Sequence, residues 1–206
     1  MTIKAAFDIV LINKREEKDM EERHIQRIST KYMVLCAMFT ALTAIGAFIQ
    51  VPVPYMDYFT LQFFFVLLSG IVLGGKRGAA SVGCYVLLGL IGFPVFAAGG
   101  GIGYIVRPSF GYLLGFIAAA FVTGWICERT DCTYKQYFLA CLAGFTVTYT
   151  IGILYKYLIL NFYADTPATL GVVLLSCFPL DMPGDFVLCL VAAGTGRRLK
   201  RAVGGY

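Results

Sequence analysis

The chain has 206 residues, of which 59% are hydrophobic and 14% are charged, and its mean hydropathy is +0.76. Soluble domains have about 45–50% apolar and about 25% charged residues, so this composition excludes a soluble enzyme, a nucleic-acid-binding module and a disordered tail. At about 20 apolar residues per membrane span, the chain can cross a bilayer about five to seven times. The sequence therefore predicts an all-α integral membrane protein.

The N-terminal residues 1–31 form the one long polar segment. Residues 14–23 read KREEKDMEER, a mixture of both charge signs that is typical of a solvated helical or unstructured arm. We expect no signal peptide, because the first residues lack a basic region followed by a short apolar core. The predicted organisation is a cytoplasmic arm at 1–31, one membrane domain at 32–200 and a cytoplasmic tail at 201–206.

Runs without Lys, Arg, Asp or Glu locate the predicted membrane helices. Five such runs are 18 residues or longer, and within lipid a helix satisfies its own backbone hydrogen bonds. A weaker sixth span begins at Pro183, a residue suited to the first turn of a helix. Residues 161–182 are predicted to form a short helix or a loop. The six predicted helices span residues 32–50, 59–74, 79–94, 108–127, 136–160 and 183–198.

The basic residues predict the orientation. Fifteen of the 17 Lys and Arg residues lie in the arm, in the 74–78 turn, in the 128–135 loop or after Gly196. Because cytoplasmic segments are rich in Lys and Arg, both termini are predicted to be cytoplasmic, with Arg107 and Lys156 left for the other side. The net charge of +5 therefore reflects topology and requires no nucleic-acid partner.

Two glycine-rich motifs are rejected as phosphate sites. Residues 70–76 fit the first seven positions of a P-loop, but Arg77 replaces the Ser or Thr that would hold Mg²⁺, and the motif closes a membrane helix. Gly99–Gly103 lacks G-x-G-x-x-G spacing. The only histidine, His24, lies in the arm, and the seven cysteines form no C-x-x-C pair. We expect no catalytic residue, no metal site and no cofactor.

The predicted outer connections carry unusual residues. Two prolines within 50–62 favour extended backbone. The connection 93–108 contains the glycine cluster and ends at Arg107. Because apolar residues flank the cluster, we expect this connection to fold into the mouth of the bundle; a mobile surface loop is the alternative.

One acidic residue is predicted inside a membrane helix. Asp185 falls about one turn into the last helix, where an ionised carboxylate needs a partner and marks function. Helix capping is the alternative, although Asp181 is the more natural cap. Arg107 and Lys156 are candidate partners or ligand clamps. The other candidate binding residues are Gln62, Tyr58, Tyr85, Tyr112 and Phe96, and for each of them a packing or interfacial role is as well supported.

Beyond these residue patterns, the sequence resembles a known family. Residues 30–200 resemble the BioY family of biotin-uptake proteins, which are the substrate-binding (S) components of energy-coupling-factor (ECF) transporters. The motifs that carry the resemblance are Val51–Pro54, Phe59–Gly70, Gly74–Gly78, Ser81–Tyr85, Leu87–Phe96, Gly99–Gly103, Gly111–Phe116 and Pro183–Asp185.

The resemblance implies a six-helix S component of the cell membrane that binds biotin from outside with high affinity. It also implies a transmembrane coupling subunit and two ATP-binding cassette ATPases as partners. In such proteins, small residues of the first helix dock on the coupling subunit. Ala37 and Ala41 match that pattern and Ala44 continues it, although a contact within the chain explains the stripe equally well.

One position departs from the family pattern. Many members carry a Lys three residues after the Asp, where this chain has Leu188. The resemblance implies that Asp185 accepts hydrogen bonds from the ureido N–H groups of biotin, and we expect Gln62 to be a second partner of the ring. We expect Arg107 or Lys156 either to contact the carboxylate of biotin or to neutralise the charge of Asp185. The alternatives are an S component for another vitamin, a stand-alone facilitator or channel and, with least support, a membrane-embedded enzyme.

Overall fold

A computed structural model gives the structure of the chain, which divides into two compact units, residues 1–35 and 36–206. Of the first unit, only residues 30–35 are described, and they form the start of the helix Thr30–Phe48. In full, the described residues are 30–51, 59–129, 133–163, 168–177 and 181–204.

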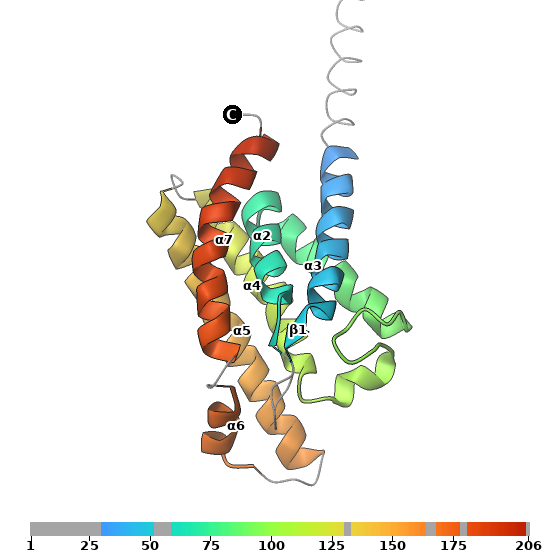
Figure 1. Cartoon of the computed structure of the whole chain (residues 1–206). Helices are drawn as coiled ribbons and strands as arrows, with labels where there is room; N and C mark the ends of the chain where they lie inside the picture. The colour runs from blue at the N-terminus through green and yellow to red at the C-terminus, as the bar shows by residue number, and fades with distance from the viewer. Residues whose placement is uncertain (1–29, 52–58, 130–132, 164–167, 178–180, 205–206) are drawn as a thin grey trace, which may run out of the picture. The chain divides into compact units, whose positions relative to one another are not determined.

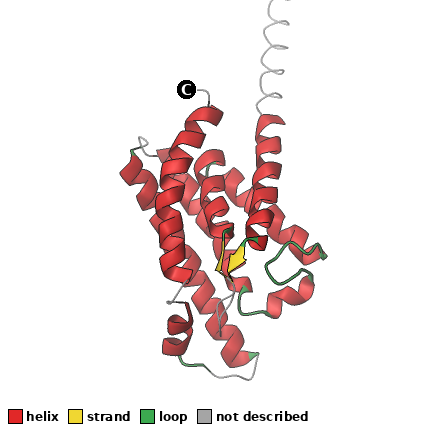
Figure 2. Ribbon diagram, in the orientation of Figure 1, coloured by secondary structure: helices red, strands yellow, loops and turns green. Residues whose placement is uncertain are grey.

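The second unit is a helical bundle with one small hairpin (Figures 1 and 2). The hairpin pairs β1 and β2 antiparallel, with Gln50 opposite Thr60 and Val51 opposite Phe59. After the helix that ends at Phe48, the elements in chain order are β1 (Gln50–Val51), β2 (Phe59–Thr60), α2 (Gln62–Leu73), α3 (Gly75–Ile91), the 3₁₀ helix η1 (Ile102–Val106), α4 (Phe110–Arg129), α5 (Tyr134–Phe162), α6 (Leu170–Cys177) and α7 (Asp181–Gly204).

Several of these helices have the length and hydropathy of membrane spans. Three qualify singly among the described residues: Thr30–Phe48, Phe110–Arg129 and Tyr134–Phe162. The bent pair Leu170–Ser176 and Asp181–Val203, inclined by 51°, makes a fourth when taken as one broken span. The helix α2 is apolar but has 12 residues.

Glycines allow α2, α3 and α4 to pack closely. A Cβ at Gly70 would lie 2.6 Å from the Ala120 carbonyl oxygen of α4, and a Cβ at Gly78 would lie 2.9 Å from Gly70. Close approach of backbones provides the dispersion contacts that hold helices together in lipid, where burial of apolar surface gives little attraction. On the other side of the bundle, α4 packs along α5, and α7 packs against α2 and α5.

The first helix joins the bundle through a polar contact with α3. Thr40 Oγ1 and Ser81 Oγ lie 3.2 Å apart, and Ser81 Oγ donates to the Cys36 carbonyl at 2.8 Å. Of the small residues predicted to dock on a partner, Ala37 and Ala41 are exposed and Ala44 is half-buried. Ala47, one turn further, is fully buried.

Most predicted helix positions agree with the structure, and the main difference lies between the second and third helices. The predicted turn at 74–78 is reduced to Gly74, whose φ of +83° is accessible to glycine, and α3 begins at Gly75 instead of residue 79. Glu128 Oε1 accepts a hydrogen bond from the Gly75 N–H at 3.2 Å, which satisfies one donor at the start of α3. Lys76 and Arg77 therefore lie in the first turn of α3.

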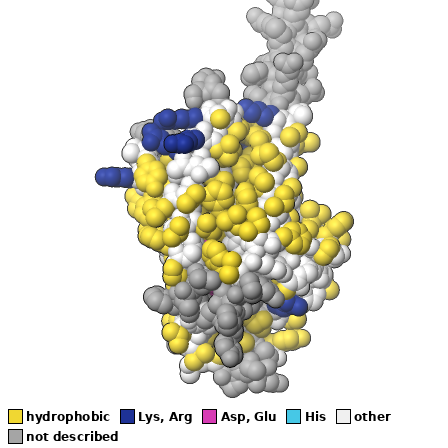
Figure 3. Space-filling view, in the orientation of Figure 1, with side chains coloured by type: hydrophobic (Ala, Val, Ile, Leu, Met, Phe, Trp, Pro, Cys, Tyr) yellow, Lys and Arg dark blue, Asp and Glu magenta, His cyan; other side chains and the backbone are white. Residues whose placement is uncertain are grey.

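The surface of the bundle has a polarity that suits a membrane (Figure 3). Hydrophobic side chains cover much of the visible flank, and Lys and Arg side chains gather at the end where α7 terminates. Exposed large apolar residues occur on several helices, among them Leu87, Leu139 and Val187. Such a band is expected where lipid tails contact the protein.

Candidate binding site

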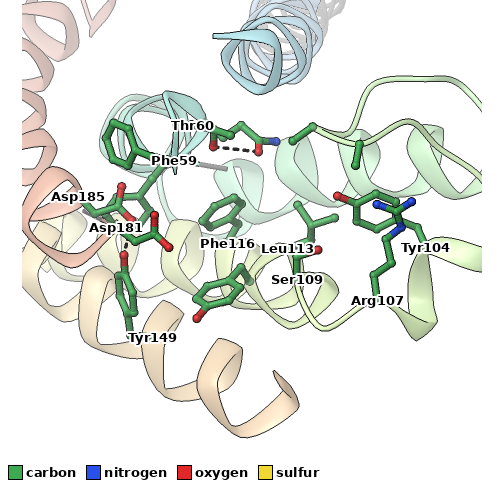
Figure 4. A pocket seen from close by; sticks show the side chains of 15 residues that line it. Phe59, Thr60, Tyr104, Arg107, Ser109, Leu113, Phe116, Tyr149, Asp181 and Asp185 are labelled. Atoms are coloured by element: carbon green, nitrogen blue, oxygen red, sulfur yellow. Dashed lines mark hydrogen bonds between the residues drawn. The ribbon is translucent and has the colours of Figure 1, made fainter. Parts of the chain in front are cut away.

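A cavity opens at the end of the bundle where α2, α4 and α7 begin (Figure 4). It contains about 760 Å³ of space free of protein atoms, counted out to its open mouth. Its walls come from the hairpin, α2, the α3–α4 connection, α4, α5 and α7. The lining residues are Phe59, Thr60, Gln62, Phe63, Ala97, Ala98, Tyr104, Arg107, Ser109, Tyr112, Leu113, Phe116, Tyr149, Asp181 and Asp185.

One end of the cavity is acidic. Asp185 of α7 is 9% exposed, and its Oδ2 accepts a hydrogen bond of 2.9 Å from the Tyr149 hydroxyl of α5. Asp181, at the start of α7, lines the same end. Among the described residues, no Lys or Arg pairs with the Asp185 carboxyl. This buried carboxyl can therefore accept hydrogen bonds from a ligand's N–H groups.

The other end of the cavity is basic (Figure 4). Arg107 ends η1, and its guanidinium carbon lies 5.2 Å from the centre of the Tyr104 ring. Contact with an aromatic face favours a cation electrostatically. Arg107 is exposed as a residue and lines the cavity. It can therefore meet the anionic end of a ligand without the cost of a fully buried charge.

Aromatic rings line the space between the two ends. Phe63 of α2 and Phe116 of α4 have ring centres 5.9 Å apart, and the ring of Phe145 of α5, which is not a lining residue, is centred 6.3 Å from that of Phe63. Figure 4 shows Phe116, Leu113 and Ser109 between the acidic and basic groups. The cavity therefore combines an apolar middle with polar groups of opposite charge at its ends.

Two helical glycines leave room for aromatic rings of the cavity wall. A Cβ at Gly152 of α5 would lie 2.5 Å from the Tyr112 ring, and a Cβ at Gly184 of α7 would overlap the Phe59 ring. Tyr112 and Phe59 therefore rest against bare helix backbone. The shape of the cavity depends on glycines that do not line it.

Hydrogen bonds connect the segments around the mouth. Thr60 Oγ1 donates to Gln62 Oε1 at 3.2 Å, and Gln62 Nε2 donates to the Tyr85 hydroxyl. Tyr85 in turn donates to the Val95 carbonyl at 3.1 Å. The Gln62 side chain, 4% exposed, thus links the hairpin, α3 and the α3–α4 connection. This set of bonds is called the Gln62 chain below.

The structure brings four of the eight predicted binding residues to the cavity wall: Asp185, Arg107, Gln62 and Tyr112. Tyr85 and Phe96 are buried behind the wall, with ring centres 5.5 Å apart. Lys156 lies on α5 and is not among the lining residues. Tyr58 lies outside the described residues.

The α3–α4 connection folds back on α3, as the glycine cluster predicted. The Gly101 N–H donates to the Gly89 carbonyl at 2.7 Å, and Phe96 and Gly99 exchange two backbone bonds. Ala97 and Ala98 of this connection line the cavity. The connection therefore forms part of the cavity wall, as predicted, although Phe93 and Ile102 at its two ends are exposed.

Tyr149 is one of the polar lining residues that the sequence interpretation missed, with Thr60, Tyr104 and Ser109, and it is the one that bonds to Asp185. It is one of 13 tyrosines, and it lies in a predominantly apolar helix. Its spacing from Asp185 along the chain gives no indication that the two side chains meet. Only the packing of α5 against α7 brings them together.

A helical bundle with membrane-length apolar helices and a charged, partly apolar cavity at one end defines an integral membrane protein that binds a small molecule. Comparison with known proteins narrows this class. The model of the BioY family matches residues 18–205, and the chain belongs to the BioY family.

Relatives and a solved structure agree with that membership. The "Probable biotin transporter BioY" of Lysinibacillus sphaericus is 40% identical over 178 residues, which is 86% of this chain and 90% of the relative. The "Biotin transporter BioY" of Thermotoga maritima is 38% identical over 175 residues, covering 83% and 96%. A crystal structure of the S-component for biotin from an ECF-type ABC transporter is similar with a TM-score of 0.68 and 25% identity, covering 85% of this chain and 93% of that one.

Proposed function

We propose that the chain binds biotin with high affinity as the S component of an ECF-type transporter and delivers it for uptake. The observation that carries this proposal is the cavity with Asp185 and Tyr149 at one end and Arg107 at the other. Biotin has a matching distribution of groups: a ureido ring with N–H donors, an apolar middle and a carboxylate. Similarity to proteins named as biotin transporters supports the same ligand.

In the proposed orientation, the ureido ring lies at Asp185 and the carboxylate at Arg107. The ring donors would otherwise be buried unpaired, which costs about 1–3 kcal/mol for each group. Phe63, Phe116 and Tyr112 would contact the apolar atoms between. Since Lys156 does not line the cavity, Arg107 is the better candidate for the carboxylate.

We further propose six membrane spans, with both termini and the 1–31 arm in the cytoplasm. The gathering of Lys and Arg where α7 ends supports this orientation (Figure 3). It places the cavity at the outer face of the cytoplasmic membrane.

The proposed role is capture and not catalysis. A transmembrane coupling subunit and two ATPase subunits would supply the energy. Exposed Ala37 and Ala41, with half-buried Ala44, would form the docking surface, because small residues allow close helix approach in lipid.

Binding to the purified chain tests the function. The protein in detergent is expected to retain radiolabelled biotin, to release it to unlabelled biotin and to keep it in the presence of thiamine, riboflavin or lipoate. Mass spectrometry of the untreated preparation should identify biotin as a co-purified molecule. Failure of intact, monodisperse protein to bind biotin contradicts the proposal, and displacement by another vitamin would assign that vitamin instead.

Uptake measurements separate the proposal from a stand-alone facilitator. Vesicles that contain this chain alone should not accumulate biotin, whereas vesicles that also contain the coupling subunit and ATPases should do so with ATP inside. ATP-independent biotin flux through the chain alone would support a facilitator.

A further inference from the structure

Tyr149 is the side chain that fixes the Asp185 carboxyl. Its hydroxyl lies 2.9 Å from Oδ2 and donates the hydrogen bond across the α5–α7 interface. The other oxygen, Oδ1, receives no hydrogen bond from a described side chain. One oxygen is therefore held by the protein, and the other is left for a ligand in the cavity that Asp185 lines.

The Tyr149 ring is itself held firmly. It packs at 4.6 Å from the Phe145 ring and at 5.8 Å, edge to face, from the Tyr112 ring. Tyr149 is 5% exposed, so its hydroxyl has little access to water. A donor fixed in this way restricts rotation of the carboxyl, which lowers the entropy that ligand binding must remove.

We infer that Tyr149 is a positioning residue that presents one oxygen of Asp185 to the cavity and so sets the preference for ligands with ring N–H donors. The inference rests on the proposed function, because it assigns the ring end of the ligand to Asp185. It adds the Tyr149 hydroxyl to the acidic end of the cavity, where the sequence predicted a single carboxyl. The recognition unit is a carboxyl and a hydroxyl from two helices.

The test is a double-mutant cycle on biotin affinity, measured by calorimetry in detergent. Tyr149→Phe keeps the ring and removes the hydroxyl, and it should weaken binding about tenfold, since the buried carboxyl loses both a hydrogen bond and its fixed orientation. With Asp185→Ala already present, the same change should alter affinity less than about twofold. Asp185→Val, which also removes both carboxyl oxygens, replaces Asp185→Ala if the latter does not fold.

A matched control exists at the same helix pair. The Tyr134 hydroxyl of α5 donates to the Leu190 carbonyl of α7 at 3.3 Å and lies outside the cavity. Tyr134→Phe should leave biotin affinity unchanged. Any effect of losing an α5–α7 hydrogen bond in general would appear in this variant as well.

A second readout uses the ligand. A biotin analogue methylated on its ureido nitrogens cannot donate to Asp185, so Tyr149→Phe should change its affinity less than about twofold. Biotin amide is altered only at the tail, so Tyr149→Phe should reduce its affinity as much as that of biotin. Equal losses for every ligand, or equal losses with and without Asp185, would show a merely structural role and overturn the inference. Absence of biotin binding to the unsubstituted protein would overturn the proposed function instead.

Discussion

At the acidic end of the cavity, the Asp185 carboxyl lies 9% exposed among aromatic side chains. An acidic group is costly in a membrane segment, and it persists where it has a partner or a ligand. Here Tyr149 supplies one hydrogen bond. We propose that the ligand supplies the others.

Asp185→Ala should therefore weaken biotin binding about tenfold to a hundredfold, because the ring donors lose their acceptor and remain buried at about 1–3 kcal/mol each. Calorimetry on the purified variant measures this change. Elution as a single species in size-exclusion chromatography controls for folding. Unchanged affinity in folded protein would remove Asp185 from the site.

Arg107 should contribute less than Asp185, since its side chain is exposed and water screens the charge. Arg107→Gln should weaken biotin binding roughly three- to tenfold. Biotin amide, which has no carboxylate, should bind Arg107→Gln and the unsubstituted protein equally. A loss of the same size for the amide would place the carboxylate elsewhere.

The sequence alone identified Arg107 because it is a charge between two long charge-free runs, and Asp185 because it falls about one turn into a predicted membrane helix. It could not identify Tyr149 or Phe116 as cavity residues, since tyrosines and phenylalanines are frequent throughout the chain. Their role depends on which helix faces lie opposite one another. Periodicity does not encode that information in helices that are apolar all round.

At the scale of the helices, the shape of the cavity depends on residues without side chains. Gly152 and Gly184 admit the rings of Tyr112 and Phe59. The sequence shows these glycines but not their partners. Charge-free runs likewise predict where the helices lie. They do not predict the boundary between α2 and α3, because that boundary depends on the positive φ of Gly74.

Gly152→Ala should displace Tyr112, because the new Cβ would lie 2.5 Å from its ring. Overpacking of this kind costs about 1–3 kcal/mol, and we expect lower thermal stability together with weaker biotin binding. Gly83→Ala is the control, since nothing lies within 4 Å of its Cβ position on α3. Equal behaviour of the two variants would contradict the role of Gly152.

At the scale of the whole molecule, the distribution of Lys and Arg predicts how the chain is oriented in the membrane. Cysteine labelling measures that orientation directly. In a variant whose native cysteines are replaced, Ile102→Cys should react on intact cells with a membrane-impermeant thiol reagent, and Arg201→Cys should not. Both positions are exposed in the structure. Labelling at 201 from outside would reverse the proposed topology.

Assembly gives a second test at this scale. Ala41→Leu adds bulk to the exposed small-residue face, so it should prevent co-purification with the coupling subunit and leave biotin binding unchanged. Thr146→Leu, exposed on α5, is the control. Normal assembly of Ala41→Leu would favour the alternative of an intramolecular role for the stripe.

The Gln62 chain has a consequence for how quickly a captured molecule escapes. One amide holds Thr60 at the hairpin and, through Tyr85, Val95 of the α3–α4 connection. If either segment lifts alone, a buried polar group loses its partner, which costs about 1–3 kcal/mol. The two segments should therefore open in concert and rarely, so that slow dissociation, more than fast capture, would account for the high affinity that we propose.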